Sequence, residues 1–331
     1  HTLAGKKYLP VFAQLQSDHQ NVHCIFCDSF VTTEDGTGLV HLAPAFGEDD
    51  QRVLSDAGIN DLFCHVDEKG NFDDSIDPLF TGRNVFETNS DIIKYLKEAE
   101  YLYDQKTIDH SYPHCPRSDT KLIYKAVSSW YVSVSKFKDA LVKNLIPTHW
   151  MPEHIKDKRF ANWLENARDW AISRNRFWGN PIPLWINDVS GKILCMNSLE
   201  KLERYTGRKI DDLHREIVDD LRFQVKGEVG VYHRTSEVLD CWFESGAMPF
   251  AQNHYPFAGQ AIEDIFPADF IAEGLDQTRG WFYTLHVIAT ALFDKAAYKN
   301  VNVNGIILAS DGKKMSKRLK NYTPPDLLIE E

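Results

Sequence analysis

The stretch that decides the fold is "DFIAEGLDQTRGWFYTLHVIATALFDKAAYKNVNVNGIILA", residues 269–309. Its first residues, 269–274, are typical of a strand, and the apolar run over 276–293 predicts a buried helix. A second strand is expected over 301–309. A strand, a helix and a strand in this order build a parallel sheet. We therefore expect an α/β fold here, as in half of a doubly wound sheet.

A cluster of basic residues follows the second expected strand. The chain has a formal net charge of −11, yet "SDGKKMSKRLK" (310–320) gathers five lysines and arginines within eight positions. Asp311 and Gly312 form a turn signal, which puts these cations on a loop beyond the carboxyl end of the sheet, where ligands of such sheets bind. Lysines there can contact phosphate oxygens and stabilise the charge of a leaving pyrophosphate. A solvated basic loop without a ligand is the other interpretation.

The amino-terminal part has a different pattern. Residues 1–125 are mixed and strand-rich, which is typical of an α+β module. Strands are expected at 21–32 and 36–44, and a hairpin turn at 67–72. A helix with a capping residue is expected at 89–102.

Three further segments follow. We interpret 126–185 as a connecting segment, with one amphipathic helix over 153–171 predicted from its apolar spacing. Residues 186–235 read as a small helical insertion, in which two short helices are separated at Gly207. The α/β pattern described above then occupies 236–331.

The composition limits the class of protein. At 331 residues the chain is long enough for two or more domains, and its 43% hydrophobic and 26% charged residues are typical of a soluble globular protein. Its apolar windows are too short for a membrane span, and no secretion signal begins it. Six scattered cysteines fit reduced thiols and a cytoplasmic location. Two partial zinc patterns, at Cys24 and Cys27 and around Cys115, lack complete ligand pairs, so we expect no structural zinc.

Several motifs resemble one family. "KMSKR" (314–318) resembles the KMSKS loop of class I aminoacyl-tRNA synthetases. "FIAEGLDQTRGWFYTL" (270–285) resembles the adenylate-binding strand and helix of the isoleucyl-tRNA synthetases, and "EVLDCWFESGAMPFAQ" (237–252) resembles another of their elements. "ARDWAISRNRFWGNPIPLW" (167–185) resembles a block beside their active site, where we assign Arg174 and Arg176 no role.

The resemblance implies roles for eight residues of the catalytic part. The loop lysines would assist amino-acid activation, four residues would hold the aminoacyl-adenylate, and two tryptophans would line the amino-acid pocket. These are, in order, Lys314 and Lys317; Glu273, Gly274, Asp276 and Gln277; and Trp242 and Trp281. Without the resemblance, Asp276 would be read as a helix cap and Trp281 as a core residue.

An editing site is implied in the amino-terminal part. "GTGLVHLAPAFGEDD" (36–50) resembles the editing segment that hydrolyses mischarged valyl-tRNA, although Phe46 stands where the family often has His. Asp50 would orient the α-ammonium of the substrate, and His41 would belong to the same site. Asp49 or Asp50 could instead cap a helix. Isoleucine and valine differ by one methylene, which is worth only about 1–3 kcal/mol of discrimination, so a second, hydrolytic selection step is required. Isoleucyl-tRNA synthetases are the standard example of this argument.

The resemblance as a whole implies an isoleucine–tRNA ligase of the eukaryotic cytosolic type. Its substrates would be isoleucine, ATP with Mg²⁺, and tRNA(Ile), with hydrolytic editing of valyl-tRNA(Ile). Whether it joins a complex of several synthetases stays open, and no membrane partner is expected. The implied fold is an editing (CP1) portion followed by half of a Rossmann-like catalytic domain.

The sequence contains no His-Ile-Gly-His-type motif and no Thr-rich editing strand. We therefore expect an internal piece of a longer enzyme that is inactive alone. Two alternatives remain: a tRNA-binding or trans-editing module without activation activity, and a relative specific for valine.

Overall fold

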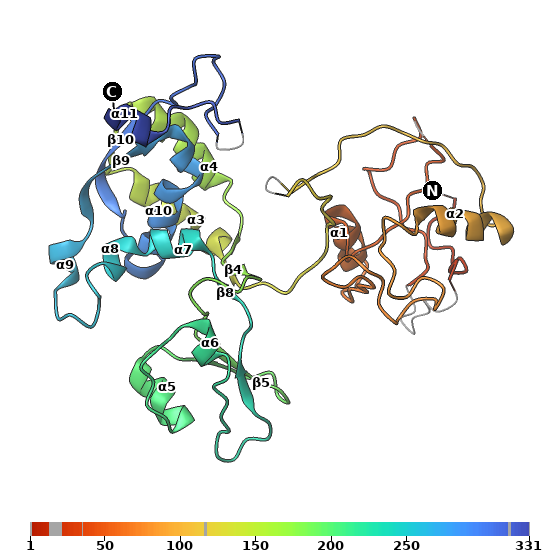
Figure 1. Cartoon of the computed structure of the whole chain (residues 1–331), viewed down its shortest axis with the longest axis horizontal. Helices are drawn as coiled ribbons and strands as arrows, with labels where there is room; N and C mark the ends of the chain where they lie inside the picture. The colour runs from red at the N-terminus through yellow and green to blue at the C-terminus, as the bar shows by residue number, and fades with distance from the viewer. Residues whose placement is uncertain (1, 13–21, 35, 116–117, 317–318, 331) are drawn as a thin grey trace. The chain divides into compact units, whose positions relative to one another are not determined.

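The computed structural model describes residues 2–12, 22–34, 36–115, 118–316 and 319–330 (Figure 1). The chain divides into two compact units, His1–Ser128 and Ser129–Glu331. Each unit is described by itself.

The first unit contains little regular structure. Its helices are α1 (Glu48–Asp56) and α2 (Asn89–Glu98). The hairpin turn expected at 67–72 is confirmed, since Val66 bridges Phe72 and the Asp67 side chain accepts hydrogen bonds from two backbone N–H groups of the turn.

The strands expected at 21–32 and 36–44 are wrong for the residues that the structure describes, as is the strand-rich character of this part. Only an isolated bridge, Lys7 to Cys24, involves either segment. Alternating apolar residues form a strand where a neighbouring backbone completes the ladder and a core covers one face. Here Leu39 and Val40 are 59% and 55% exposed, so neither condition holds for this pair.

The second unit holds the strands and most of the helices. Its strands are β1 (Tyr131–Val132), β2 (His149–Met151), β3 (Trp170–Ala171), β4 (Ser173–Arg174), β5 (Leu184–Asn187), β6 (Ile193–Cys195), β7 (Tyr232–Arg234), β8 (Val238–Leu239), β9 (Ala268–Gly274) and β10 (Tyr298–Asn304). Its helical segments are η2 (Val134–Phe137), α3 (Lys138–Leu145), η3 (Ile155–Phe160), α4 (Ala161–Glu165), α5 (Leu199–Thr206), α6 (Arg215–Val218), α7 (Cys241–Gly246), α8 (Met248–Ala251), α9 (Ile262–Ile265), η4 (Leu275–Arg279), α10 (Trp281–Phe293) and α11 (Pro325–Glu330).

The predicted strand–helix–strand unit is confirmed. β9 and β10 pair in parallel, β2 pairs in parallel with the other side of β10, and α10 connects β9 to β10 (Figure 1). Residues 282–290 of α10 are all buried, as its apolar sequence requires. Each fully buried Phe or Leu of this kind stabilises the fold by about 1.5–3 kcal/mol.

The limits of this unit differ from the prediction at two points. The helix expected over 276–293 is interrupted at Gly280, where the 3-10 helix η4 ends and α10 begins. The strand expected over 301–309 ends at Asn304, because Leu308 instead forms a bridge with Lys314 in the basic loop.

The connecting helix is shorter than expected. The segment predicted as one amphipathic helix over 153–171 is a π-helix, η3, followed by α4, which ends at Glu165. Phe160, Leu164 and Ala167 are buried as the spacing predicts. Ala171 departs from the pattern because it lies in β3, which pairs antiparallel with β1.

The insertion is not purely helical. Its two predicted short helices are present as α5 and α6, and Gly207 ends α5 with a φ of +66°. However, β6, β5 and β7 form a three-stranded antiparallel sheet around a separate core that includes Trp185 and Tyr232. The prediction missed it because residues 188–191 form a tight turn between two strands that each contain only a few residues.

Candidate functional site at the carboxyl edge of the parallel sheet

The ends of β9 and β10 meet at one edge of the sheet. Their register pairs Glu273 with Val303 and Gly274 with Asn304. Glu273 is exposed there, so its carboxylate can accept hydrogen bonds from a ligand. This edge also gives rise to η4 after β9 and to the basic loop after β10. The predicted adenylate residues and the predicted lysine loop therefore leave the sheet from the same side.

Gly274 allows a close approach of the next carboxylate. A Cβ at Gly274 would lie 2.7 Å from Oδ1 of Asp276, closer than Cβ atoms approach other atoms in proteins, so the Asp276 carboxylate would have to move. Asp276 is exposed, and it does not cap α10. The interpretation of Asp276 as the helix cap is therefore wrong.

Gln277 instead holds the first residue of α10, whose N-cap residue is Gly280. Its side-chain oxygen accepts a hydrogen bond from the backbone N–H of Trp281 at 2.7 Å. The amide nitrogen of Gln277 keeps two donors, and it forms no hydrogen bond among the described residues.

Hydrogen bonds to a buried threonine hold the turn that carries these residues. Thr278 is fully buried, donates to the carbonyl of Leu275 at 2.9 Å and accepts from Nε of Arg159 at 3.0 Å. Arg279 lies over the Trp163 ring at 4.7 Å. Sequence reasoning missed Arg159 and Thr278, because their roles come from a contact between residues 119 positions apart in the chain.

The two predicted pocket tryptophans lie on either side of Gly280. A Cβ at Gly280 would lie 3.4 Å from the Trp242 ring, so this ring packs against the junction of η4 and α10. Trp242 is 41% exposed, which leaves part of its face for a ligand. Trp281 is half-buried against the core, and its indole N–H donates to the carbonyl of Ser245 at 3.0 Å.

Helix α7 is positioned by a buried carboxylate. Asp240 accepts from the backbone N–H of Trp242 at 3.3 Å and forms an ion pair with Arg174 at 2.6 Å. Arg174 therefore holds the Asp240 carboxylate in place. Partial burial, together with the Asp240 carboxylate, raises the pKa of the Cys241 thiol, so this cysteine stays protonated near neutral pH and supplies no nucleophile. Gly246 lets α7 approach α10, since a Cβ there would lie 3.0 Å from Thr284.

The basic loop is a hairpin with a defined turn. Ala309 donates to the carbonyl of Lys313 at 2.9 Å, and the Asp311 side chain accepts from the N–H of Lys313 at 3.0 Å. Asn321 accepts from the N–H of Ser316 and donates to the carbonyl of Lys314. The Lys314 ammonium is exposed and forms no ion pair within the described ranges. Lys317 lies outside the described residues.

The two predicted editing residues lie in the first unit. Asp50 is in the first turn of α1, where its Oδ2 accepts from the backbone N–H of Ala43 at 2.9 Å. It does not cap the helix, because Gly47 is the N-cap residue. His41 is exposed, and no hydrogen bond joins it to Asp50 among the described residues.

No group of three or more His, Cys, Asp or Glu side chains in the described part of the chain is arranged to hold a metal ion. No helix described is sufficiently long and apolar to traverse a membrane.

The comparisons with known proteins all match this chain to tRNA synthetases. The family model for class I tRNA synthetases of the isoleucine, leucine, methionine and valine group matches residues 17–331. The cytoplasmic isoleucine–tRNA ligase of Schizosaccharomyces pombe is 51% identical, over 99% of this chain and 32% of the relative. The isoleucine–tRNA ligase of Chlamydia pneumoniae is 51% identical, over 99% of this chain and 31% of the relative.

The chain thus spans about a third of the length of the curated relatives that it matches. Among solved structures, the methionyl-tRNA synthetase of Mycobacterium tuberculosis is 16% identical with a TM-score of 0.40, and the match covers 66% of this chain and 33% of that one. This superposition is too loose to bear on the fold.

Proposed function

The chain belongs to the class I tRNA synthetases that serve isoleucine, leucine, methionine and valine, and on this premise we propose that it is part of an isoleucine–tRNA ligase. The protein would activate isoleucine with ATP to isoleucyl-adenylate and transfer the isoleucyl group to tRNA(Ile). Identity of about one half to enzymes named isoleucine–tRNA ligase favours isoleucine over the other three amino acids.

One observation carries this proposal. The parallel register of β9 and β10 puts Glu273 and Gly274 at the edge from which both η4 and the basic loop depart. In open α/β sheets, ligands bind outside the carboxyl ends of the strands. We therefore assign residues 236–331 to the second half of a Rossmann-like catalytic domain, with 126–185 and 186–235 as its connection and insertion.

The side chains at this edge fit an aminoacyl-adenylate. The Glu273 carboxylate would accept from a ribose hydroxyl or the α-ammonium, and Asp276 would supply a second carboxylate. The Gln277 amide would donate through its nitrogen, because its oxygen is held by Trp281. The exposed part of Trp242 and the half-buried Trp281 would form the apolar walls for the isoleucine side chain.

The lysines would act on the phosphates. Lys314 and Lys317 would stabilise the charge that develops on the pyrophosphate as the carboxylate of isoleucine attacks the α-phosphate of ATP. Mg²⁺ would enter with ATP as part of that substrate. Removing one such electrostatic contact typically costs on the order of 3 kcal/mol in the barrier.

We further propose that residues 1–125 are the later part of an editing domain. Asp50 uses one carboxylate oxygen to hold Ala43, so its other oxygen is available for the α-ammonium of a mischarged valyl-tRNA. His41 is exposed on the adjoining segment. The cytoplasmic relatives favour a cytosolic protein, although bacterial relatives match equally well.

The experiment is ATP–pyrophosphate exchange by the full-length protein that carries this sequence, with isoleucine, valine, leucine and methionine compared. We expect isoleucine to be preferred over valine by roughly 10- to 200-fold in kcat/KM, the range that one methylene gives. A preference for valine would identify the valine-specific relative. Absence of exchange with tRNA binding retained would identify the tRNA-binding module.

A further inference from the structure

Two side-chain contacts join the turn η4 to the segment formed by η3 and α4. Thr278 accepts a hydrogen bond from Nε of Arg159 at 3.0 Å, and the Arg279 guanidinium lies 4.7 Å from the centre of the Trp163 ring. Arg159 lies in η3 and Trp163 lies in α4, four residues further along the chain. Residues with this spacing are neighbours on a helix surface, so one face of this segment holds η4.

Thr278 is a buried anchor for the arginine. Its hydroxyl donates to the carbonyl of Leu275 at 2.9 Å, within the turn itself, and accepts from Arg159. The residue is 0% exposed, so solvent does not reach this hydroxyl to replace the arginine. A hydrogen bond from a charged donor is among the stronger ones in proteins. Loss of Arg159 would therefore leave Thr278 without a donor and the turn without this attachment.

The segment that holds η4 is itself fixed in the core. Phe160 is fully buried, and its ring packs against Trp150 at 4.9 Å and against His286 of α10 at 5.9 Å. Arg159 is the residue before Phe160, so its backbone has the same support. η3 is a π-helix, a geometry that is rare and often found at functional sites. The core thus determines where Arg159 meets the turn.

The second contact fixes the neighbouring residue of η4. The Trp163 ring packs edge-on against Tyr283 at 5.9 Å, and its Nε1 is buried without a hydrogen-bond partner among the described residues. Packing and the Arg279 guanidinium therefore set the orientation of this ring. A cation over an indole is attracted to it most strongly where both are partly desolvated. With Arg159 removed, η4 would be held on this side at Arg279 alone.

We propose that Arg159 is a positioning residue for the activation of isoleucine. It acts through Thr278, and so holds the two proposed adenylate ligands that precede Thr278 in η4. The inference rests on the proposed function, in which those two side chains meet the adenylate. η4 is a single short turn of five residues, so a shift at Thr278 moves the ligands as well. Catalysis depends on such placement, because reacting groups must be held close to one geometry.

The test uses the full-length protein and breaks the hydrogen bond from either side. Arg159→Gln removes the donor, Thr278→Val removes the hydroxyl at similar volume, and Thr278→Ser keeps it. Lys158→Gln is the matched control, since it also removes one positive charge from an exposed position of η3. Two quantities are measured for each variant: kcat/KM for isoleucine in ATP–pyrophosphate exchange, and the amide hydrogen exchange of residues 276–279.

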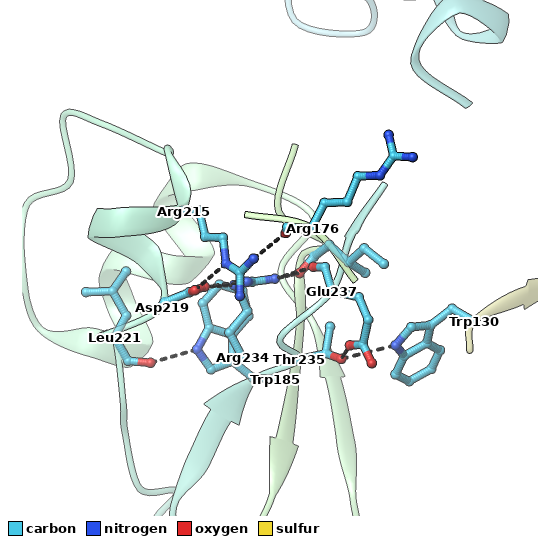
Figure 2. A network of polar contacts seen from close by, with 10 residues as sticks. Trp130, Arg176, Trp185, Arg215, Asp219, Leu221, Arg234, Thr235 and Glu237 are labelled. Atoms are coloured by element: carbon cyan, nitrogen blue, oxygen red, sulfur yellow. Dashed lines mark hydrogen bonds and ion pairs between the residues drawn. The ribbon is translucent and has the colours of Figure 1, made fainter. Parts of the chain in front are cut away.

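A second control separates positioning from a general loss of stability. In the insertion, Asp219 accepts from Nε of Arg215 at 2.7 Å and, through its other carboxylate oxygen, from Nε of Arg234 at 2.6 Å (Figure 2). The Arg234 side chain is 1% exposed. This network lies in the insertion, whose core is separate from the core that contains α10. Asp219→Ala therefore destabilises the protein without breaking a contact of η4.

Arg159→Gln and Thr278→Val are expected to lower kcat/KM by roughly 10- to 100-fold, the scale of effect that a displacement of about 1 Å can have. Both should also speed amide hydrogen exchange in η4. The double variant should be no worse than the more affected single variant, because both changes break one bond. Thr278→Ser should restore both quantities. Lys158→Gln and Asp219→Ala should match the wild type in kcat/KM and in the exchange of η4.

Four results would overturn the proposal: an equal loss of kcat/KM in Lys158→Gln, independent losses that add in the double variant, unchanged hydrogen exchange of η4, or faster exchange of η4 with full activity. Absence of pyrophosphate exchange with isoleucine in the wild type would instead overturn the proposed function. Amide hydrogen exchange would then still decide whether Arg159 holds the turn.

Discussion

The side-chain oxygen of Gln277 accepts the backbone N–H of Trp281 at 2.7 Å, across a glycine that has no room for a Cβ. One hydrogen bond thus links the turn at the sheet edge to the first residue of the most deeply buried helix. The Trp242 ring packs against the same glycine. A larger residue at Gly280 would therefore displace three of the proposed ligand-binding side chains, those of Gln277, Trp281 and Trp242.

Gly280→Ala tests this link. The added Cβ would lie 2.5 Å from Oε1 of Gln277, so the amide must move and the backbone N–H of Trp281 at the start of α10 loses its acceptor, as when a helix cap is removed. Loss of a cap costs about 1 kcal/mol, and the displaced Gln277 should also weaken isoleucine binding. Gly305→Ala is the control for stability, since a Cβ there meets nothing within 4 Å. Equal melting temperatures for the two variants in thermal denaturation would contradict the account.

Asp240 tests how α7 is positioned. Its carboxylate is 4% exposed and binds both Arg174 and the backbone N–H of Trp242. Asp240→Ala removes the ion pair and the cap, and should lower the free energy of unfolding by roughly 2–4 kcal/mol. Asp240→Asn keeps an acceptor for the cap and should cost less. Urea denaturation gives both values, and equal losses would mean that the ion pair contributes nothing.

Asp219 tests the network of the insertion. Asp219→Ala leaves the buried Arg234 guanidinium without its acid partner, which typically costs about 3–5 kcal/mol. We expect faster hydrogen exchange in β5 and β7, while α10 keeps its protection. The exposed neighbour Asp220→Ala is the matched control and should leave exchange unchanged. Equal exchange rates of β5 and β7 in Asp219→Ala and Asp220→Ala would show that the ion pair of Asp219 and Arg234 does not stabilise this core.

The buried His286 predicts a pH dependence of stability. Its Nε2 lies 2.8 Å from the carbonyl oxygen of Leu141, and its Nδ1 has no partner among the described residues. Burial lowers its pKa to about 4. Below pH 6.5 the unfolded chain takes up a proton that the folded chain excludes, so stability falls as the pH is lowered toward 4.

The free energy of unfolding should fall by at most about 1.4 kcal/mol per pH unit because of His286. His286→Gln should be less stable at neutral pH but should lack this part of the slope, whereas the exposed His154→Gln should retain it. Denaturant melts between pH 7 and 4 measure both slopes. An unchanged slope in His286→Gln would show that other groups set the pH dependence.

The parallel strand–helix–strand unit could be predicted because its long apolar run lies between two segments with strand-forming residues. An apolar run buried on every side, as in α10, fits only a helix covered by a sheet and further helices. In the strand that follows it, β10, the valines alternate with polar residues, and Val301 and Val303 are buried. The break at Gly280 could not be predicted. Gly280 is non-helical there, and a Cβ on it would crowd Gln277 at 2.5 Å and the Trp242 ring at 3.4 Å, contacts that form only in the folded chain.

The first unit shows the opposite case. Leu39 and Val40 belong to an alternating pattern, but a strand is a property of two segments, and no ladder partner for them occurs in the ranges described. For the candidate site, the motifs predicted Glu273 and Gly274, which the structure places at the edge of the sheet, and their role stays a prediction. The supporting contacts of Arg159 and Asp240 join residues that are 119 and 66 positions apart, so they leave no local pattern in the sequence.

The most direct test of the central claim is the binding of a stable isoleucyl-adenylate analogue to the full-length protein, measured by calorimetry. Glu273→Gln is compared with Asp269→Asn, a change at the opposite end of the same strand, where Asp269 forms an exposed ion pair with Lys299. We predict that Glu273→Gln weakens binding by roughly 10- to 100-fold, as expected for loss of a hydrogen bond to a charged group, and that Asp269→Asn leaves it unchanged. Equal affinity of Glu273→Gln and the wild type would contradict the assignment of the adenylate site to this edge of the sheet.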